Sequence, residues 1–142
     1  TASGVKSINV DGGSVVGVTT SSEGKYILVL TEKGYGKMSD INDYRLTKRG
    51  SQGVLTIKAG EKNGSLAKIV AVNGEEDILV VTNLGIIIRT SLKEVKVAGR
   101  NTLGVRIIRL INDFKIKKYI KKELKALFLF FGRLFYLICI IA

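Results

Sequence analysis

The chain has 142 residues, no proline, no histidine, one cysteine and a formal net charge of +11 at pH 7. The lone Cys139 and the lack of histidine exclude a disulfide framework and the usual zinc ligand sets, and they favour a reducing compartment. Residues 1–110 carry sixteen Lys and Arg against ten Asp and Glu, and residues 111–142 carry seven against two. Both parts are therefore basic, which is typical of proteins that bind nucleic acid. For any single lysine, however, a solubilising role is the simpler interpretation.

The sequence repeats itself at a spacing of 51 residues. Nine residues recur at this spacing, namely Ile27, Leu28, Val29, Thr31, Gly34, Arg49, Gly53, Val54 and Ile57, which match Ile78, Leu79, Val80, Thr82, Gly85, Arg100, Gly104, Val105 and Ile108. A further Gly-Val-x-x-Ile copy begins at Gly4. A period near fifty is typical of propeller blades, which bury their apolar faces only against neighbouring blades.

The repeats predict how the chain is divided. Residues 1–25 hold the end of one blade and a connection, 26–76 form a blade, and 77–110 form part of the following blade. A closed propeller needs more copies than are present, so we expect an incomplete ring and a piece of a longer polypeptide. Residues 111–142, first basic and then apolar, are expected to lie outside this fold.

Turn signals between short runs of Val, Ile and Leu predict the strands. Pairs such as Asn63-Gly64 and Asn73-Gly74 adopt positive φ easily and therefore favour antiparallel hairpins. The predicted strands span 14–20, 26–31, 34–38, 53–58, 66–72, 78–82, 86–90 and 105–110. The sequence thus predicts an all-β fold whose blades each hold four antiparallel strands.

A polar connection lies between the inner strands of each repeat and its closing strand, over 39–50 and 91–101. An apolar residue every two or three positions indicates that each connection follows its blade and presents a basic, glycine-containing tip. The candidate DNA-binding residues are Lys37, Arg45, Lys48, Arg49, Arg89, Lys96, Arg100 and Arg106. The glycines expected to shape turns are Gly34, Gly50, Gly53, Gly85, Gly99 and Gly104.

Catalytic motifs are missing from the sequence. It contains no Gly-Lys-Ser/Thr phosphate loop, no His-Glu-x-x-His, no Gly-x-Ser-x-Gly and no histidine that could act as a general base. The acidic run 75–77 favours a solvated turn over a metal site. We therefore predict a binding module without catalytic residues, metal ligands or a cofactor of its own.

Several segments carry a family resemblance. They are Thr-Glu-Lys-Gly-Tyr-Gly-Lys at 31–37, Tyr-Arg-Leu at 44–46, Lys-Arg-Gly-Ser-Gln-Gly-Val at 48–54, Glu-Glu-Asp at 75–77, Thr-Asn at 82–83 and Gly-Arg-Asn-Thr-Leu-Gly-Val-Arg at 99–106. Over residues 1 to about 110 the chain resembles the C-terminal domain of bacterial DNA gyrase A. The recurring Arg-x-x-x-Gly-Val element is the most specific part of this resemblance.

The resemblance implies a β-pinwheel that wraps duplex DNA around its basic outer rim and so supports ATP-dependent negative supercoiling by a type IIA topoisomerase. It implies as partners duplex DNA, the rest of the gyrase A polypeptide and gyrase B, and a cytoplasmic, nucleoid-associated location without a membrane. ATP, Mg²⁺ and the strand-cleaving tyrosine belong to other domains. The family's Gln-Arg-Arg-Gly-Gly-Lys-Gly box has only a degenerate match at 47–53.

Two other functions remain alternatives. One is the equivalent domain of topoisomerase IV, although the regular Arg-x-x-x-Gly-Val copies favour gyrase. The other is a protein-interaction propeller whose basic face is incidental.

The resemblance is expected to end after Leu110, and the tail allows three interpretations. The apolar run 127–142 is shorter than the ~20 residues that span a bilayer and contains Arg133, which argues against a transmembrane helix. An interfacial membrane anchor is the first interpretation that remains. Helical spacing over 115–126 predicts a C-terminal helix packed on the blades. A shifted reading frame is favoured, because residues that adenine- and thymine-rich codons supply dominate the tail and glycine falls from fifteen to one.

Overall fold

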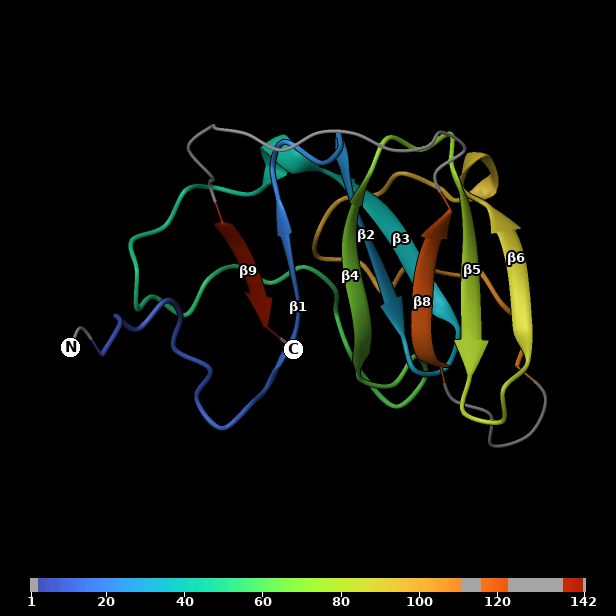
Figure 1. Cartoon of the computed structure of the whole chain (residues 1–142), viewed down its shortest axis with the longest axis horizontal. Helices are drawn as coiled ribbons and strands as arrows, with labels where there is room; N and C mark the ends of the chain where they lie inside the picture. Colours follow the sequence, from blue (N-terminus) through green and yellow to red (C-terminus); the bar gives the residue numbers. More distant parts are fainter. Residues whose placement is uncertain (1–2, 111–115, 123–136, 142) are drawn as a thin grey trace.

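The computed structural model describes residues 3–110, 116–122 and 137–141. These residues form nine strands, arranged in three antiparallel sheets, and two short 3-10 helices (Figure 1). The all-β prediction is confirmed.

The first blade is a four-stranded sheet in the order β4-β2-β3-β7. Its centre is β2 (Tyr26–Thr31), which pairs with β3 (Tyr35–Asp40) on one side and β4 (Leu66–Val72) on the other. The outer strand β7 (Val105–Arg106) comes from the following repeat and pairs with the start of β3. The first blade is therefore completed by a segment of the second repeat.

The second blade is a three-stranded sheet in the order β6-β5-β8, formed by β5 (Asp77–Thr82), β6 (Ile87–Ser91) and β8 (Ile116–Lys122). The register of β8 on β5 copies that of β4 on β2, and both pairs shift at the last step, which lies between Val81 and Thr82 in β5. The helical interpretation of the basic stretch is thus wrong over 116–122. The open edge of β5 accepts a strand there, as the edge of β2 accepts β4.

A two-stranded sheet joins β1 (Val15–Thr20) to β9 (Leu137–Ile141). The strand β1 lies beside β4, where the Ala71 N–H donates to Thr19 Oγ1 at 3.0 Å. The interpretations of the apolar run as an anchor or a frameshift product fall largely on residues 123–136, outside the described residues. In the part of the chain that the structure describes, no helix has the length and hydropathy of a membrane span.

The predicted strands mostly agree with the observed ones, but two need correction. Residues 53–58 form no strand, and the strand predicted over 105–110 is reduced to β7. The two segments are repeat equivalents, but only β7 finds a sheet edge in the described structure, namely β3. The segment after β7 leaves the ladder because the N–H groups of Ile107 and Ile108 both donate to Gly34 O, at 3.0 and 3.1 Å.

The core consists of two clusters, one on each face of the first blade. Ile27 and Val29 of β2 point into one cluster, whereas Leu28 and Leu30 point into the other, because successive strand residues face opposite sides. Residues from both blades build the cluster around Leu28, which also contains Met38, Val72, Ile78, Val80, Leu92, Val95, Ile108 and Ile116. This shared cluster fixes the second blade against the first.

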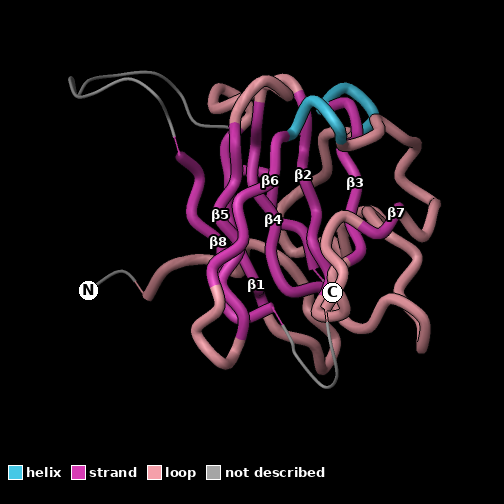
Figure 2. Tube along the Cα trace, turned by 90° about the vertical axis from the view of Figure 1, so that its right-hand side faces the viewer, coloured by secondary structure: helices cyan, strands magenta, loops and turns pink. Residues whose placement is uncertain are grey.

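Both 3-10 helices lie at the same end of the molecule (Figure 2). They are η1 (Ile41–Asp43) after β3 and η2 (Leu92–Glu94) after β6, and each begins one connection. The Asp40 carboxylate caps η1 by accepting the Asn42 N–H at 2.8 Å. The two connections therefore start from the same edge of the stacked blades.

Candidate nucleic-acid interface

Each connection is anchored by one buried residue directly after its short helix. Tyr44 packs into the cluster that contains Ile27, and its repeat equivalent Val95 packs into the shared cluster. Burial raises the pKa of the Tyr44 phenol, which hydrogen-bonds Thr56 Oγ1. The connections follow their blades, as the spacing of their apolar residues predicts.

The second connection runs along β3 of the first blade. The Met38 N–H donates to Lys96 O at 3.3 Å, and the Ala98 N–H donates to Met38 O at 2.8 Å. The Ser39 hydroxyl also donates to Ala98 O at 2.8 Å. These bonds fix the backbone that leads into the basic tip at 99–102.

Lys37 of β3 lies beneath this tip. Its side chain is fully buried, and its ammonium group donates to Gly99 O at 2.5 Å, to Arg100 O, and to Thr102 Oγ1 at 3.0 Å. The pKa of Lys37 falls from 10.5 to about 8, mainly because burial disfavours the charged form; the Arg100 charge also lowers it, and Asp43 acts in the opposite direction. A direct DNA contact by Lys37 does not fit this geometry, because the connection covers its charge.

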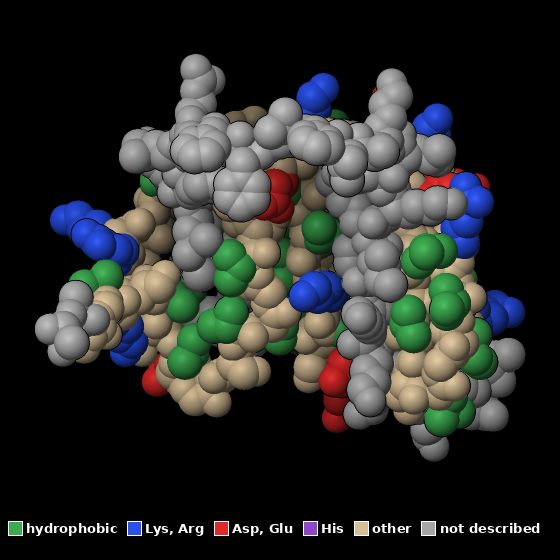
Figure 3. Space-filling view, in the orientation of Figure 1, with side chains coloured by type: hydrophobic (Ala, Val, Ile, Leu, Met, Phe, Trp, Pro, Cys, Tyr) green, Lys and Arg blue, Asp and Glu red, His purple; other side chains and the backbone are tan. Residues whose placement is uncertain are grey.

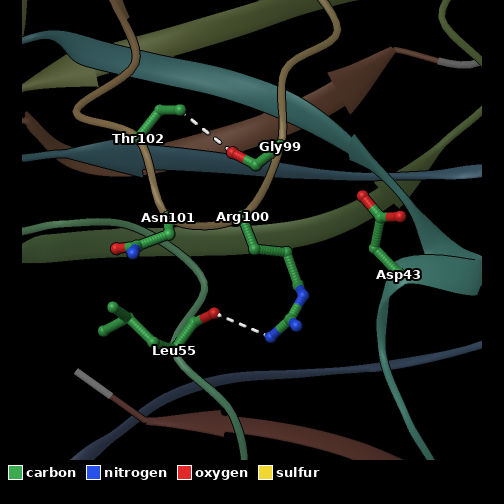
Figure 4. A pocket seen from close by; sticks show the side chains of 6 residues that line it. All are labelled: Asp43, Leu55, Gly99, Arg100, Asn101 and Thr102. Atoms are coloured by element: carbon green, nitrogen blue, oxygen red, sulfur yellow. Dashed lines mark hydrogen bonds between the residues drawn. The ribbon is translucent and has the colours of Figure 1, made fainter.

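Arg100 is half-buried at the tip, beside a pocket of about 570 Å³ (Figure 4). Its guanidinium donates from Nη1 to Leu55 O at 3.2 Å and lies 5.6 Å from the centre of the Tyr44 ring. The lining residues are Asp43, Leu55, Gly99, Arg100, Asn101 and Thr102. The guanidinium is thus oriented by one hydrogen bond and one cation–π contact while part of it stays at the surface.

The tip of the first connection is exposed at Arg45, Lys48 and Arg49. Its backbone is braced by the N-terminal segment: the Gly50 N–H donates to Ser7 O at 2.8 Å, and the Asn9 N–H donates to Ser51 O at 3.0 Å. The cations of this tip are therefore presented on a supported loop.

Two pairs of cations occupy equivalent repeat positions. Arg45 corresponds to Lys96, and both are exposed; Arg49 corresponds to Arg100. Most of the Lys and Arg side chains visible in Figure 3 lie toward the outline of the molecule in this view.

Two further predicted residues interact with neighbouring side chains. Arg89 forms a salt bridge with Asp77, in which its Nε donates to Asp77 Oδ2 at 2.7 Å. Arg106 is exposed, but its Nη2 donates to the Tyr35 hydroxyl at 2.9 Å and its guanidinium lies 5.2 Å from the centre of that ring. Because Asp77 offsets its charge, Arg89 is the weaker candidate for contact with an anion.

The acidic run at 75–77 has a structural explanation. The Glu76 carboxylate accepts the N–H groups of Asn73 and Gly74, both at 2.8 Å, and that of Glu75 at 3.1 Å. These bonds support the interpretation as a turn.

Two predicted glycines permit close backbone approach. A Cβ at Gly34 would lie 2.4 Å from Ile108 O, and a Cβ at Gly104 would lie 2.6 Å from Gly36 O. Both have positive φ, of +80° and +77°. Of the other predicted glycines, Gly50, Gly53 and Gly85 also have positive φ. Gly99 has neither a positive φ nor a neighbour within 4 Å of an added Cβ, so its predicted role finds no support.

Sequence reasoning missed the residues that orient the tips. Tyr44 and Leu55 hold the Arg100 guanidinium, and Ser39 holds the backbone of the second connection. Lys37 was predicted as a contact to DNA, whereas in the structure it holds this backbone. The one signal in the sequence was the aromatic residue beside a basic one in Tyr44-Arg45, since the other contacts depend on tertiary structure.

Comparisons with known proteins agree with this architecture. The family model described as the DNA gyrase C-terminal domain, beta-propeller, matches residues 25–73 and 76–117, so the likeness extends beyond Leu110, where it was expected to end. The DNA gyrase A protein of Ureaplasma parvum serovar 3 is 50% identical over 117 residues, which are 82% of this chain and 14% of that protein. The DNA gyrase A protein of Staphylococcus aureus strain MRSA252 is 45% identical over 116 residues, which are 80% of this chain and 13% of that protein.

Solved structures show the same fold. The C-terminal domain of DNA gyrase A matches with a TM-score of 0.65 and 29% identity, covering 70% of this chain and 34% of that one. The C-terminal domain of DNA topoisomerase IV matches with a TM-score of 0.70 and 17% identity, covering 84% and 38%. The chain thus spans a small part of its full-length relatives, and it belongs to the DNA gyrase C-terminal domain family.

Proposed function

We propose that this chain binds duplex DNA through the basic tips of its two connections and that its parent protein is a gyrase A, in which the domain wraps DNA for ATP-dependent negative supercoiling. Family membership supports the class of function. The proposal depends mainly on one observation: basic side chains recur at equivalent positions of the two connections, Arg45 with Lys96 and Arg49 with Arg100. Both connections start at the same end of the molecule.

The chemistry of these tips suits a phosphate backbone. Arginine donates in a fixed fork that matches phosphate oxygens, whereas lysine acts as a point charge. Contacts of this kind release counterions and carry little sequence information, so binding should be general and strongly dependent on salt.

Wrapping requires that contacts with the protein offset the free-energy cost of bending the DNA. Smooth bending of 20–30 base pairs costs about 1–6 kcal/mol, so several phosphate contacts along a curved path are needed. A row of repeated blades supplies such a path because each copy contributes one basic tip. In the parent complex, ATP, Mg²⁺ and strand cleavage belong to other domains, the remaining partners are the rest of the gyrase A polypeptide and gyrase B, and the location is the cytoplasm, at the nucleoid.

The first test is direct binding. Fluorescence anisotropy with a short random-sequence duplex should show affinity at about 50 mM salt that falls steeply toward about 200 mM. Energy transfer between dyes at the two ends of the same duplex should rise on binding if the DNA is bent. Binding without a rise in energy transfer would support DNA binding but contradict wrapping by this chain. No binding at low salt would exclude the whole proposal.

One observation favours the alternative of a protein-interaction module. Leu84, Ile86 and Ile87 are 70%, 49% and 64% exposed around the β5–β6 turn, and hydrophobic side chains are visible over that end in Figure 3. Such a patch is suited to a protein neighbour rather than to phosphate. Undetectable DNA binding by a folded chain would leave this alternative as the better account.

A further inference from the structure

Lys37 occupies an unusual place for a lysine. Its side chain is fully buried, and three oxygen atoms of residues 99–102 surround its ammonium group. A lysine ammonium has three donors and no acceptor, so Gly99 O, Arg100 O and Thr102 Oγ1 match its full donor capacity. Thr102 Oγ1 also donates to Gly99 O at 3.0 Å, which closes the loop around the ammonium group.

This arrangement acts on Arg100 through the backbone. One of the three acceptors is the carbonyl of Arg100 itself, and the others lie one residue before and two residues after it. The segment that carries the guanidinium is therefore held at two backbone carbonyls and one side-chain hydroxyl, while Tyr44 and Leu55 orient the guanidinium itself.

The repeat shows that this lysine is an addition to the blade pattern. The residue 51 positions after Lys37 is Ile88, at the equivalent place in β6. In the second blade this position is half-buried against the shared cluster and holds an isoleucine, so a charge there is not required for the fold of a blade. Burial of a charge costs free energy unless hydrogen-bond partners compensate for it, and at Lys37 these partners all belong to residues 99–102.

We infer that Lys37 is a positioning residue of the DNA interface, whose buried ammonium group holds residues 99–102 in one conformation and so sets the place of the Arg100 guanidinium. The inference rests on the proposed function for its role toward DNA, but the holding of the loop is independent of DNA. Two charged groups act on Lys37: Arg100 from the connection, which opposes its charge, and Asp43 of η1, which favours it.

The loop is tested by hydrogen exchange in the DNA-free 142-residue chain. The informative amides are those of Ala98 and Lys58, which donate to Met38 O and Thr102 O at the two sides of the loop. Lys37→Met keeps the length of the side chain and removes the ammonium group, so exchange at both amides should accelerate. Lys25→Met, which removes an exposed lysine, is the matched control and should leave them unchanged.

The link to DNA is tested by a double-mutant cycle on duplex affinity. Lys37→Met should weaken binding by no more than Arg100→Ala does, and it should have little further effect once Arg100 is alanine. A direct phosphate contact by Lys37 would instead give independent effects and lower the salt slope of binding by about 0.9 on its own. That result, or unchanged exchange in a folded Lys37→Met chain, would overturn the inference.

The unsubstituted chain provides a second readout if Lys37→Met does not fold. Protection of the Ala98 and Lys58 amides, corrected for intrinsic exchange, should fall as pH rises through about 8, where Lys37 loses its proton. The Ile107 amide, which donates to Gly34 O, is the internal control. Because the unfolded chain binds this proton more tightly, between about pH 8 and 10.5 its titration makes the folded state relatively more stable, so local loosening is distinguishable from unfolding.

Flat protection of both amides through this pH range would overturn the holding role. Absence of DNA binding by the unsubstituted chain would instead refute the proposed function and the role of Lys37 toward DNA, while exchange would still decide whether Lys37 holds the loop.

Discussion

The central strands of the two blades share a sequence pattern but differ in burial. In β2 all five residues after Tyr26 are buried, whereas in β5 burial alternates with partial exposure from Asp77 to Thr82. The next strands differ more: β3 is buried over 35–39, and β6 has no fully buried residue. The side chains of β2 are thus buried on both faces of the first blade, whereas those of β5 are fully buried on one face of the second blade.

The adjacent repeat causes this difference in burial between the two blades. The edge of β3 is paired with β7 and with the connection at 96–98, both from the next repeat. Within the described residues no segment covers β6 in this way, and Ile86 and Ile87 at its start are exposed. Burial in a repeat of this kind is therefore a property of the adjacent copy as much as of the residue itself.

The largest effect is expected where one repeat closes on the other. Gly104→Ala should lower the free energy of unfolding by about 3 kcal/mol or more, because it combines a strained positive φ with a clash against the Gly36 carbonyl. Gly4→Ala is the matched control, because Gly4 is the repeat equivalent with φ of +73° and no atom within 4 Å of an added Cβ. It should cost about 1 kcal/mol. Equal losses in urea unfolding would show that β7 does not close the first blade.

The next largest effect is expected from truncating a core leucine, which should cost more stability in the first blade than in the second. Leu28→Ala should cost about 3 kcal/mol, because Leu28 is fully buried in the shared cluster. Leu79→Ala, at the equivalent half-buried position, should cost about half as much. Thermal unfolding of both variants gives the comparison, and a larger loss at Leu79 would contradict the one-sided burial of the second blade.

A smaller effect is expected from a contact that the second blade lacks. Tyr35→Phe removes the hydroxyl that accepts Arg106 Nη2 at 2.9 Å but keeps the ring under the guanidinium. The loss should be about 0.5–1 kcal/mol, as for one partly exposed hydrogen bond. Ile86, the repeat equivalent of Tyr35, has no hydroxyl, and Ile86→Val should change the free energy of unfolding by less. A loss well above 1 kcal/mol for Tyr35→Phe would mean that the hydroxyl supports more than this contact.

Sequence was sufficient where structure is local. The hairpins around Gly34 and Gly85 were predicted because their turns and apolar runs lie next to each other in the chain. The strand predicted over 53–58 failed because strand formation there depends on a distant edge, which β7 finds and 53–58 does not. The strand β8 was missed because the apolar residues in this part of the sequence follow a helical spacing, whereas its actual conformation is set by pairing with β5.

For the candidate site, too, some features could be predicted from the sequence and others depend on the fold. The recurrence of Arg49 as Arg100 was visible at a fixed spacing. The burial of Lys37 was not predictable, because lysine is ordinarily exposed and only the fold shows that the next connection lies over β3. Repeats thus indicate which residues are equivalent, whereas the neighbouring copy decides what each one contacts.

Whether the repeated connections bind DNA is decided by comparing two charge-matched double variants in duplex binding at several salt concentrations. Arg49→Ala/Arg100→Ala removes the recurring arginines, and Lys25→Ala/Lys62→Ala removes two exposed lysines outside the connections. We expect the arginine variant to bind more weakly and its salt slope to fall by about 1.8, which is two phosphate contacts, while the lysine variant keeps the slope of the unsubstituted chain. Equal slopes in two folded variants would contradict a DNA interface at the repeated connections.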